Sequence, residues 1–319
     1  MKTVPLGSTG RQVSALCLGA MNFGTKLDEK GSWQLLDRYY EVGGRFIDTA
    51  NNYAFWWGGK GTESENVLGR WMRDRGNRGD LFLATKVGFN TPAVGNGLSR
   101  RLIRQEIEGS LRRLGTDHVE LYYAHKDHRA DALEETLATF DELHREGKIQ
   151  TIGCSNYRAW RIEEARALSR ARGWIGYCCV QQRHTYLRPA NGASFEPQIA
   201  SDEELLDYGR SHAADFLVLG YSSTLGGAYD GRSDRPIPSQ YRGPDTDARL
   251  AALRAVASQT GATPVQVVYA WMLRSTPPVL PLVSAGSLKQ LNENLGALGV
   301  NLDDAQMKML DEAGAPRSD

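Results

Sequence analysis

The sequence predicts an α/β fold in which residues 1–319 form a single (β/α)8 barrel, the TIM-barrel architecture. Three observations support this prediction. Eight short apolar runs occur along the chain, and longer segments with helical spacing and charged faces separate them. Runs that lack polar alternation are typical of strands buried on both faces of a parallel sheet. Eight strand–helix units are the number that closes such a barrel.

The expected elements follow one another in a regular order. The runs that we expect as strands are Ala15–Leu18, Phe46–Ile47, Leu81–Ala84, Val119–Tyr123, Thr151–Ile152, Ile175–Val180, Phe216–Leu219 and Val279–Val283. Helical spacing is evident over Arg101–Leu114, Leu133–Glu146, Trp160–Arg172 and Asp202–His212. An extra C-terminal helix is expected over Asp303–Ala313, where it caps or flanks the barrel.

Three segments interrupt the alternation of strands and helices. Thr49–Thr62 and Gly226–Thr246 are long, rich in glycine or proline, and aromatic, and Arg188–Pro197 also has the composition of a loop. Because the first two follow expected strands, we expect them to project from the C-terminal face of the barrel. Barrel enzymes keep their active sites on that face.

An open, doubly wound sheet is the main alternative to a barrel. Such a sheet usually carries a glycine-rich phosphate-binding turn after its first strand. The segment Leu18–Gly24 does not match the G-x-G-x-x-G pattern, and Gly59-Lys60-Gly61 has the wrong order for a phosphate-binding P-loop. The sequence therefore favours the barrel.

Composition and charge exclude several classes of function. The chain is 41% hydrophobic and 24% charged, as in ordinary globular proteins. With 38 basic and 38 acidic residues it lacks the basic surplus of proteins that bind nucleic acid or anionic membranes. Its apolar runs are shorter than about ten residues, against the roughly 20 needed to span a bilayer.

The N-terminal MKTVPLGSTG has no apolar core of a signal peptide, so we expect a cytoplasmic protein. No sequence feature indicates its oligomeric state.

The cysteines indicate neither disulfides nor a metal site. There are four, Cys17, Cys154, Cys178 and Cys179, too few for a disulfide scaffold and without the spacing of a zinc site. We expect buried free thiols. His125 and His128 are three residues apart, but without a third ligand they do not predict a metal centre, and His128 is read as facing solvent.

Polar residues follow most of the expected strands and are the strongest sign of function. They are Asp48, Thr85-Lys86, His125, Ser155-Asn156, Gln181-Gln182 and Tyr221-Ser222. In a barrel these positions converge on one mouth, where polar residues indicate binding or catalysis. The set contains Asp, Lys and His, together with a loop Tyr, but no cysteine nucleophile or paired carboxylates. Such residues can tune the pKa of a phenol and donate a proton to a carbonyl oxygen.

From Leu6 to Ala313 the chain resembles the aldo-keto reductase superfamily. The motifs that carry the resemblance are Leu6–Ser14, Phe46–Tyr53, Ala84–Lys86, Ser110–Asp117, Gly147–Lys148 with Gly153–Asn156, and Glu293–Asn294. Each match is weak alone, but their order and spacing together are specific. The resemblance supports the barrel independently of the strand count, and it implies reduction of a carbonyl by hydride from a nicotinamide.

The resemblance also implies a role for each of four catalytic residues. Tyr53 is the proton donor, Lys86 lowers the pKa of its phenol, and Asp48 holds Lys86 by an ion pair. His125 donates a hydrogen bond to the substrate oxygen. Structural alternatives exist for each: a structural ion pair for Asp48 and Lys86, a loop aromatic for Tyr53, and a core histidine for His125.

The cofactor site implied by the resemblance has several parts. Ser155, Asn156 and Gln181 bind the carboxamide of the nicotinamide, and Tyr221 stacks on its ring. The remaining expected contacts are those of Ala20, Met21 and Asp48, of the pyrophosphate loop Ser222, Ser223, Thr224, Leu225 and Gly227, and of the adenosine-binding residues Ser284, Gly286, Gln290, Glu293 and Asn294. Glu293 and Asn294 are alternatively plain helix-surface residues. Lys289, Gln290 and Arg242 are candidates for the 2′-phosphate, so NADPH is expected over NADH.

The sequence departs from the family pattern at a few positions. Ser223-Thr224 replaces a common Ser-Pro after the Tyr, Ser284 replaces a common glycine, and His184 stands where an aromatic residue is usual, so it lines the barrel wall or packs. Phe55, Trp56 and Trp57 are expected to line the substrate pocket, with general loop packing as the alternative. They favour an apolar or ring-shaped carbonyl, a sugar or natural product among them.

Two other functions remain open from the sequence. One is a non-catalytic nicotinamide-binding regulatory subunit, although the presence of all four catalytic residues weighs against it. The other is an alcohol or sugar dehydrogenase that works in the oxidative direction, because the same residues serve both directions.

Overall fold

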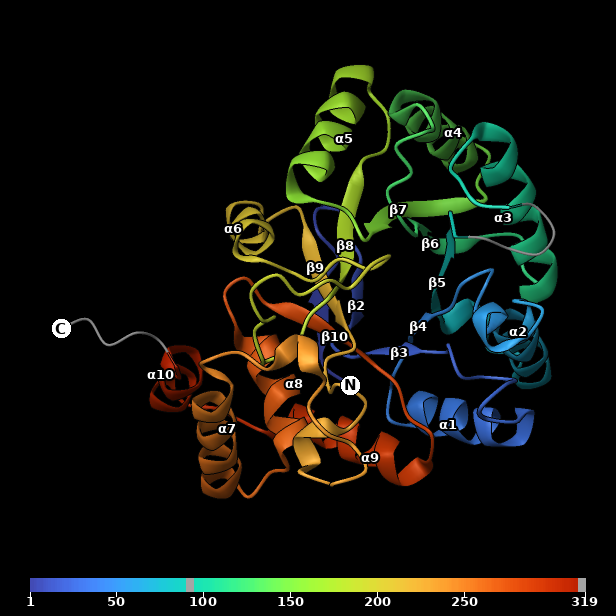
Figure 1. The fold of residues 1–319 in the computed structure, drawn as a ribbon. Helices are drawn as coiled ribbons and strands as arrows, with labels where there is room; N and C mark the ends of the chain where they lie inside the picture. The colour runs from blue at the N-terminus through green and yellow to red at the C-terminus, as the bar shows by residue number, and fades with distance from the viewer. Residues whose placement is uncertain (90–94, 315–319) are drawn as a thin grey trace.

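The computed structural model describes residues 1–89 and 95–314 and contains a closed barrel of eight parallel strands surrounded by helices (Figure 1). The strands are paired in the order β10-β3-β4-β5-β6-β7-β8-β9. Their bounds are β3 Cys17–Gly19, β4 Phe46–Asp48, β5 Phe82–Val87, β6 Val119–Ala124, β7 Ile149–Ser155, β8 Tyr177–Arg183, β9 Leu217–Tyr221 and β10 Val279–Val283. The predicted (β/α)8 barrel is confirmed.

Several strands extend beyond the apolar runs that predicted them. β5 continues through Lys86 to Val87, and β8 continues through Gln181 and Gln182 to Arg183. The backbone of these residues still pairs in the sheet while their side chains are polar, so apolar composition alone ends the predicted strands too early.

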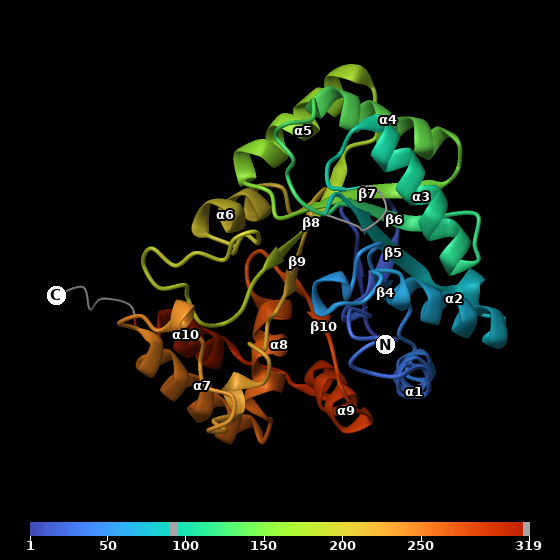
Figure 2. The ribbon, with the colours of Figure 1, turned by 45° about the vertical axis from the view of Figure 1, so that its right-hand side comes forward.

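The helices lie around the outside of the barrel in both views (Figures 1 and 2). Their bounds are α1 Glu29–Glu41, α2 Glu63–Arg75, α3 Arg100–Leu114, α4 Leu133–Arg145, α5 Ala159–Arg172, α6 Glu203–Ser211, α7 Thr246–Thr260, α8 Pro264–Arg274, α9 Leu288–Gly296 and α10 Asp304–Glu312. The predicted C-terminal helix is therefore present as α10, and it packs against α7. Helix α7 itself, which lies between β9 and α8 in the chain, was not predicted.

An N-terminal hairpin, also unpredicted, lies at the amino ends of the strands. Its strands β1 (Thr3–Pro5) and β2 (Gln12–Ser14) pair antiparallel, with Val4 opposite Val13. The hydroxyl of Ser14 accepts a hydrogen bond from the backbone of Arg45, just before β4. Leu6 and Val13 are fully buried and pack with the apolar residues inside the barrel. The hairpin thus covers the apolar interior at this end.

The core has an inner and an outer part. Inside the barrel, Phe46 and Phe82 meet edge to face, with ring centroids 5.0 Å apart, beside Tyr123 and the buried thiols of Cys17 and Cys179. The outer part fills the space between strands and helices. All four cysteines are buried and free, as predicted.

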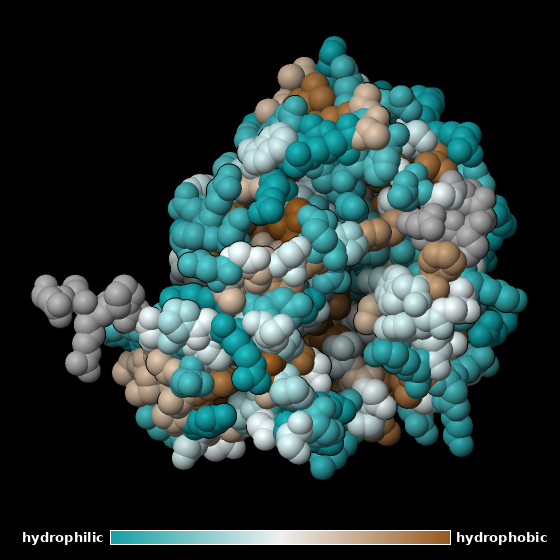
Figure 3. Space-filling model, in the orientation of Figure 1, coloured by the Kyte–Doolittle hydropathy of each residue, from teal (hydrophilic) through white to brown (hydrophobic). Residues whose placement is uncertain are grey.

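The expected loops follow the carboxyl ends of the strands. The loop after β4 contains a short 3₁₀ turn, η1 Phe55–Trp57, and the loop after β9 contains two more, η3 Ala228–Asp230 and η4 Ser239–Tyr241. The segments after β8 and β9 pass in front of the strands in Figure 1, and the face seen from there is hollowed near its centre (Figure 3). Within residues 1–89 and 95–314, no helix has the length and apolarity needed to cross a membrane.

Candidate active site

Asp48, Tyr53 and Lys86 form one buried polar cluster. The Lys86 ammonium donates to the carboxylate of Asp48, to the carbonyl of Thr49 at 2.7 Å and to the Tyr53 hydroxyl at 2.6 Å. The Tyr53 hydroxyl in turn lies 3.2 Å from Oδ1 of Asp48. Asp48 and Lys86 are fully buried and Tyr53 almost so. The sequence placed these residues at one mouth, and the structure brings them into direct contact.

Strand geometry explains how distant residues meet here. Asp48 ends β4 and is opposite Ala84 of β5, two residues before Lys86, so both polar side chains lie on the inner side of the barrel. From β8, across the barrel, the amide of Gln181 donates to Oδ2 of Asp48 at 2.8 Å. Both carboxylate oxygens are therefore occupied, which fixes the orientation of Asp48 and, through it, of Lys86.

His125 lies beside the cluster, directly after β6. Its backbone N–H donates to the carbonyl of Val87 at 2.8 Å, and its ring meets Tyr53 edge to face with a centroid separation of 6.0 Å. Its Nδ1 is buried and has no hydrogen-bond partner among the described residues. A buried ring nitrogen without a protein partner is an uncommon arrangement that a bound molecule can satisfy.

Burial and local charge set the protonation states of these groups. Burial, followed by the nearby Asp48, raises the pKa of Tyr53, so at neutral pH the phenol holds the proton that it could donate. Lys86 was expected to lower the pKa of Tyr53, but burial and Asp48 together raise it. Burial lowers the pKa of Lys86, while Asp48 acts against that shift. Burial and then Lys86 lower the pKa of His125, so its imidazole is neutral.

Four expected nicotinamide-binding residues also come together. The Ser155 hydroxyl donates to the carbonyl of Gln181 at 2.7 Å, and the Asn156 amide donates to Ser155 at 3.1 Å and to the carbonyl of His125 at 2.9 Å. The Tyr221 hydroxyl donates to Oδ1 of Asn156 at 2.7 Å. Asn156 has a positive φ of 57°, which turns its side chain into this cluster at the end of β7.

The loop after β9 is a compact turn. Ser222 and Leu225 have positive φ values, and the Leu225 N–H donates to the carbonyl of Ser222. The Ser223 hydroxyl bonds the carbonyl of Gly220, and the N–H of Gly227 bonds the carbonyl of Thr224.

Arg183, which the sequence did not single out, reaches this loop. Its guanidinium donates to the Ser222 hydroxyl at 3.3 Å, to Gln198 at 2.8 Å and to Tyr241 at 3.0 Å. Arg183 immediately follows the polar pair Gln181-Gln182, so the sequence could have indicated it as a further polar residue at the end of this strand.

The residues expected at the adenosine end surround the start of α9. Gln290 accepts a hydrogen bond from the backbone of Gly286 at 2.7 Å, and Asn294 donates to the carbonyl of Ser284 at 3.0 Å. Asn294 is buried, so it is not a helix-surface residue, and Glu293 is half-buried. The guanidinium of Arg242 donates to the carbonyl of Ile237 within its own loop.

Ala20 and Met21 follow β3, the strand that pairs with β10. The backbone N–H of Ala20 donates to the carbonyl of Asp48 at 2.8 Å, and the carbonyl of Ala20 accepts from the Ser64 hydroxyl. Met21 is half-buried.

The expected substrate residues belong to the loop after β4, in which Trp56 packs beside Tyr53. Trp56 meets the Tyr53 ring edge to face at 6.1 Å and is 51% exposed, and Trp57 is 39% exposed. Phe55, half-buried, begins the same turn. The sequence missed Phe89, whose ring lies 4.6 Å from that of His125. An aromatic residue three positions after Lys86, just beyond β5, was the signal for it.

Two other histidines were singled out from the sequence. His128 Nδ1 lies 2.8 Å from a carboxylate oxygen of Asp131, and the described residues hold no group of three or more side chains able to bind a metal ion. His128 is therefore partly buried beside Asp131 rather than simply facing solvent. His184 stacks on Trp271 with an interplanar angle of 6°, the packing role that the sequence allowed.

Comparisons with known proteins were consistent with this geometry. A sequence model of the Aldo/keto reductase family matches residues 15–315. The uncharacterized oxidoreductase YrpG of Bacillus subtilis is 30% identical, over 98% of this chain and 95% of that protein. Norsolorinic acid reductase stcV of Emericella nidulans is 31% identical, over 95% of this chain and 79% of that protein. The thermostable aldo-keto reductase Tm1743, solved with the inhibitor epalrestat, superimposes with a TM-score of 0.76 at 27% identity, over 98% of this chain and 100% of that one.

Proposed function

Since the chain belongs to the aldo/keto reductase family and is an NAD(P)H-dependent oxidoreductase, we propose that it reduces an aldehyde or ketone with NADPH and uses Tyr53 as the proton donor. The observation that carries the proposal is the Tyr53 hydroxyl, which is in hydrogen-bond contact with Lys86 and Asp48 and faces His125. A phenol so placed holds its proton at neutral pH and has a cation beside it to stabilise the charge left after donation.

The residues of the mouth divide the work of carbonyl reduction. His125, neutral and with an unpartnered ring nitrogen, binds and orients the carbonyl oxygen. Tyr53 gives that oxygen its proton, and Lys86 stabilises the phenolate that forms. Asp48, held on both oxygens, keeps Lys86 in place. Reduced nicotinamide supplies the hydride that the carbonyl carbon accepts.

The donor set after β7, β8 and β9 suits a nicotinamide. Ser155, Asn156 and Gln181 offer hydroxyl and amide groups of the kind that bind a carboxamide, and Tyr221 offers an aromatic face beside them. Ser222 to Gly227 provide the turn for the pyrophosphate, together with Arg183.

The adenosine end supports NADPH rather than NADH. Gln290 is engaged with the backbone of Gly286 at the start of α9, and the neighbouring Lys289 is exposed, so Lys289 is the first candidate for the 2′-phosphate, with Arg242 of the loop after β9 as the second. A dianionic phosphate is best bound by such charges. Ser284, Glu293 and Asn294 complete this part of the proposed site, and Ala20 and Met21 follow the neighbouring strand β3.

Titration with the two cofactors, followed by a panel of carbonyl compounds, tests the proposal. NADPH should quench tryptophan fluorescence at lower concentration than NADH, and added aldehydes or ketones should then oxidise it stoichiometrically. Binding without turnover of any carbonyl would support a regulatory subunit instead. Faster turnover of alcohols with NADP⁺ than of carbonyls with NADPH would support a dehydrogenase.

A further inference from the structure

Five aromatic rings form a continuous arc around the proposed proton donor. In order they are Trp57, Trp56, Tyr53, His125 and Phe89, and successive centroids are 5.5, 6.1, 6.0 and 4.6 Å apart. All four contacts are edge to face. Aromatic side chains gathered in this way offer apolar surface against which a further flat ring can pack. Trp56 in particular is half-exposed next to Tyr53.

A lysine stands at each end of this aromatic arc. The ammonium of Lys26 lies 3.8 Å from the Trp57 ring centroid, and that of Lys126 lies 5.9 Å from the Phe89 centroid. In the chain that the structure describes, neither forms an ion pair with a carboxylate. Asp127, next to Lys126, is instead engaged by Arg129 and Arg161.

The acids near Lys26 are engaged in the same way. Asp28 caps α1 through the backbone of Gly31, and Glu29 pairs with Arg70. Both ends of the arc therefore present a positive charge next to aromatic rings, and within residues 1–89 and 95–314 no carboxylate pairs with either ammonium.

We propose that this site takes aromatic aldehydes or ketones that carry a carboxylate, and that Lys126 binds that carboxylate. The inference rests on the proposed reductase function and names its substrate class. The Phe89 ring lies 4.6 Å from the His125 ring and 5.9 Å from the Lys126 ammonium, so we expect a benzene ring that packs on Phe89 with its carbonyl at His125 and Tyr53 to bring a para substituent within reach of that ammonium. Lys26 is separated from Tyr53 by two indole rings and is too far along the arc for a one-ring substrate.

Two matched substrates and two matched variants test this proposal. The substrates are 4-formylbenzoate and its methyl ester, reduced with saturating NADPH. In Lys126→Met the ratio of kcat/KM for acid over ester should fall about tenfold, mainly through the KM of the acid, because a partly exposed ion pair is lost. Lys26→Met, the same substitution at the other end of the arc, should keep the wild-type ratio within about twofold. Comparing ratios between variants removes the difference in intrinsic reactivity of the two aldehydes.

Ionic strength gives a second readout. For the wild type, the KM of the acid should rise with added salt while that of the ester stays level, because screening weakens the Lys126–carboxylate attraction. The proposal would be overturned if the ratio of kcat/KM for acid over ester were the same in the wild type and in Lys126→Met. It would also be overturned if that ratio fell only in Lys26→Met. Undiminished turnover of the ester shows that a variant is folded. If neither aldehyde oxidises NADPH in the wild type, it is the reductase function that fails, not only the substrate class.

Discussion

Two histidines sit deep in the protein in the neutral form, and each follows a strand end. His125 faces the reaction centre, whereas His184 stacks on Trp271 with a centroid separation of 5.7 Å and leaves its Nε2 without a partner among the described residues. Burial lowers the pKa of His184 from 6.5 to about 4. Between these values the unfolded chain binds a proton that the folded protein does not. The free energy of unfolding therefore falls as the pH drops below 6.5.

Replacing this histidine should flatten the acid side of the stability curve. In His184→Phe the ring stack on Trp271 is kept and the titrating group is lost. Relative to wild type, the variant should lose about 2 kcal/mol less free energy of unfolding between pH 7 and pH 5. Urea unfolding at the two pH values measures the difference. Equal losses in both proteins would show that protonation of His184 does not cause this fall in the free energy of unfolding.

Individual site residues were predictable to different degrees. Asp48, Lys86 and His125 follow buried strands, so the chain itself indicates that they converge. The role of Tyr53 depended on the resemblance, because its loop contains several other aromatic residues. Phe89 and Lys126 were missed, since only the folded loops show that they flank His125.

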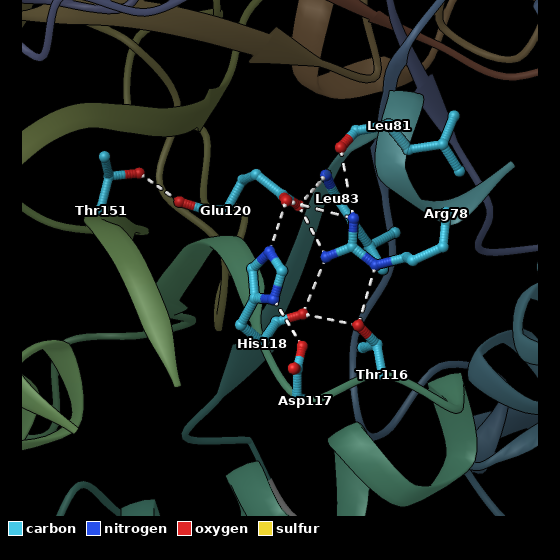
Figure 4. A network of polar contacts seen from close by, with 8 residues as sticks. All are labelled: Arg78, Leu81, Leu83, Thr116, Asp117, His118, Glu120 and Thr151. Carbon is cyan, nitrogen blue, oxygen red and sulfur yellow. Dashed lines mark hydrogen bonds and ion pairs between the residues drawn. The ribbon is translucent and has the colours of Figure 1, made fainter. Parts of the chain in front are cut away.

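At the scale of elements, the two ends of the strands carry opposite roles. At the amino ends of β5 and β6, Arg78 bonds both oxygens of Glu120 at 3.1 and 3.0 Å, and Glu120 also accepts the N–H of Leu83 at 2.8 Å (Figure 4). Arg78 further bonds Thr116 and the carbonyl of His118. These contacts tie η2 (Arg78–Asp80) to both strands on the end away from the proposed active site, where they serve stability.

Breaking this network should destabilise the barrel without changing its chemistry. Glu120→Ala leaves the largely buried Arg78 unpaired and removes the acceptor of the Leu83 N–H, so the free energy of unfolding should fall by about 3 kcal/mol. Below the unfolding transition, kcat/KM should match wild type. Glu164→Ala, which removes an exposed carboxylate from its pair with Arg161, is the control and should change stability by less than about 1 kcal/mol. A large fall in kcat/KM for Glu120→Ala would contradict the separation of roles.

Helices and strands were predictable where their residue spacing repeats over a long enough segment. The spacing of α3, α4 and α5 gave bounds within one residue, because each runs for 13 to 15 residues and buries residues at helical spacing. The hairpin β1–β2 has strands of three residues, too short for any periodicity. α7 was missed because nothing in the strand count indicates a second helix within one unit.

At the scale of the whole molecule, closure of the barrel creates the site. The polar residues of the site lie in or directly after the strands β4 to β9, and only the closed ring puts Gln181 of β8 against Asp48 of β4. The count of eight strands and the resemblance both predicted this architecture. The substrate class was not predictable in the same way, since it depends on how separate loops assemble the aromatic arc and its lysines.

The central claim is that Tyr53 donates the proton in carbonyl reduction, and Tyr53→Phe tests it most directly. Single-turnover oxidation of bound NADPH on mixing with a reactive aldehyde should be slower than wild type by a factor of about 10² or more, because a general acid is lost. NADPH affinity should stay within about threefold, since Tyr53 is not among the proposed cofactor residues and Asp48, which its hydroxyl contacts, is also held by Lys86 and Gln181. A variant that turns over within about threefold of wild type would contradict the account.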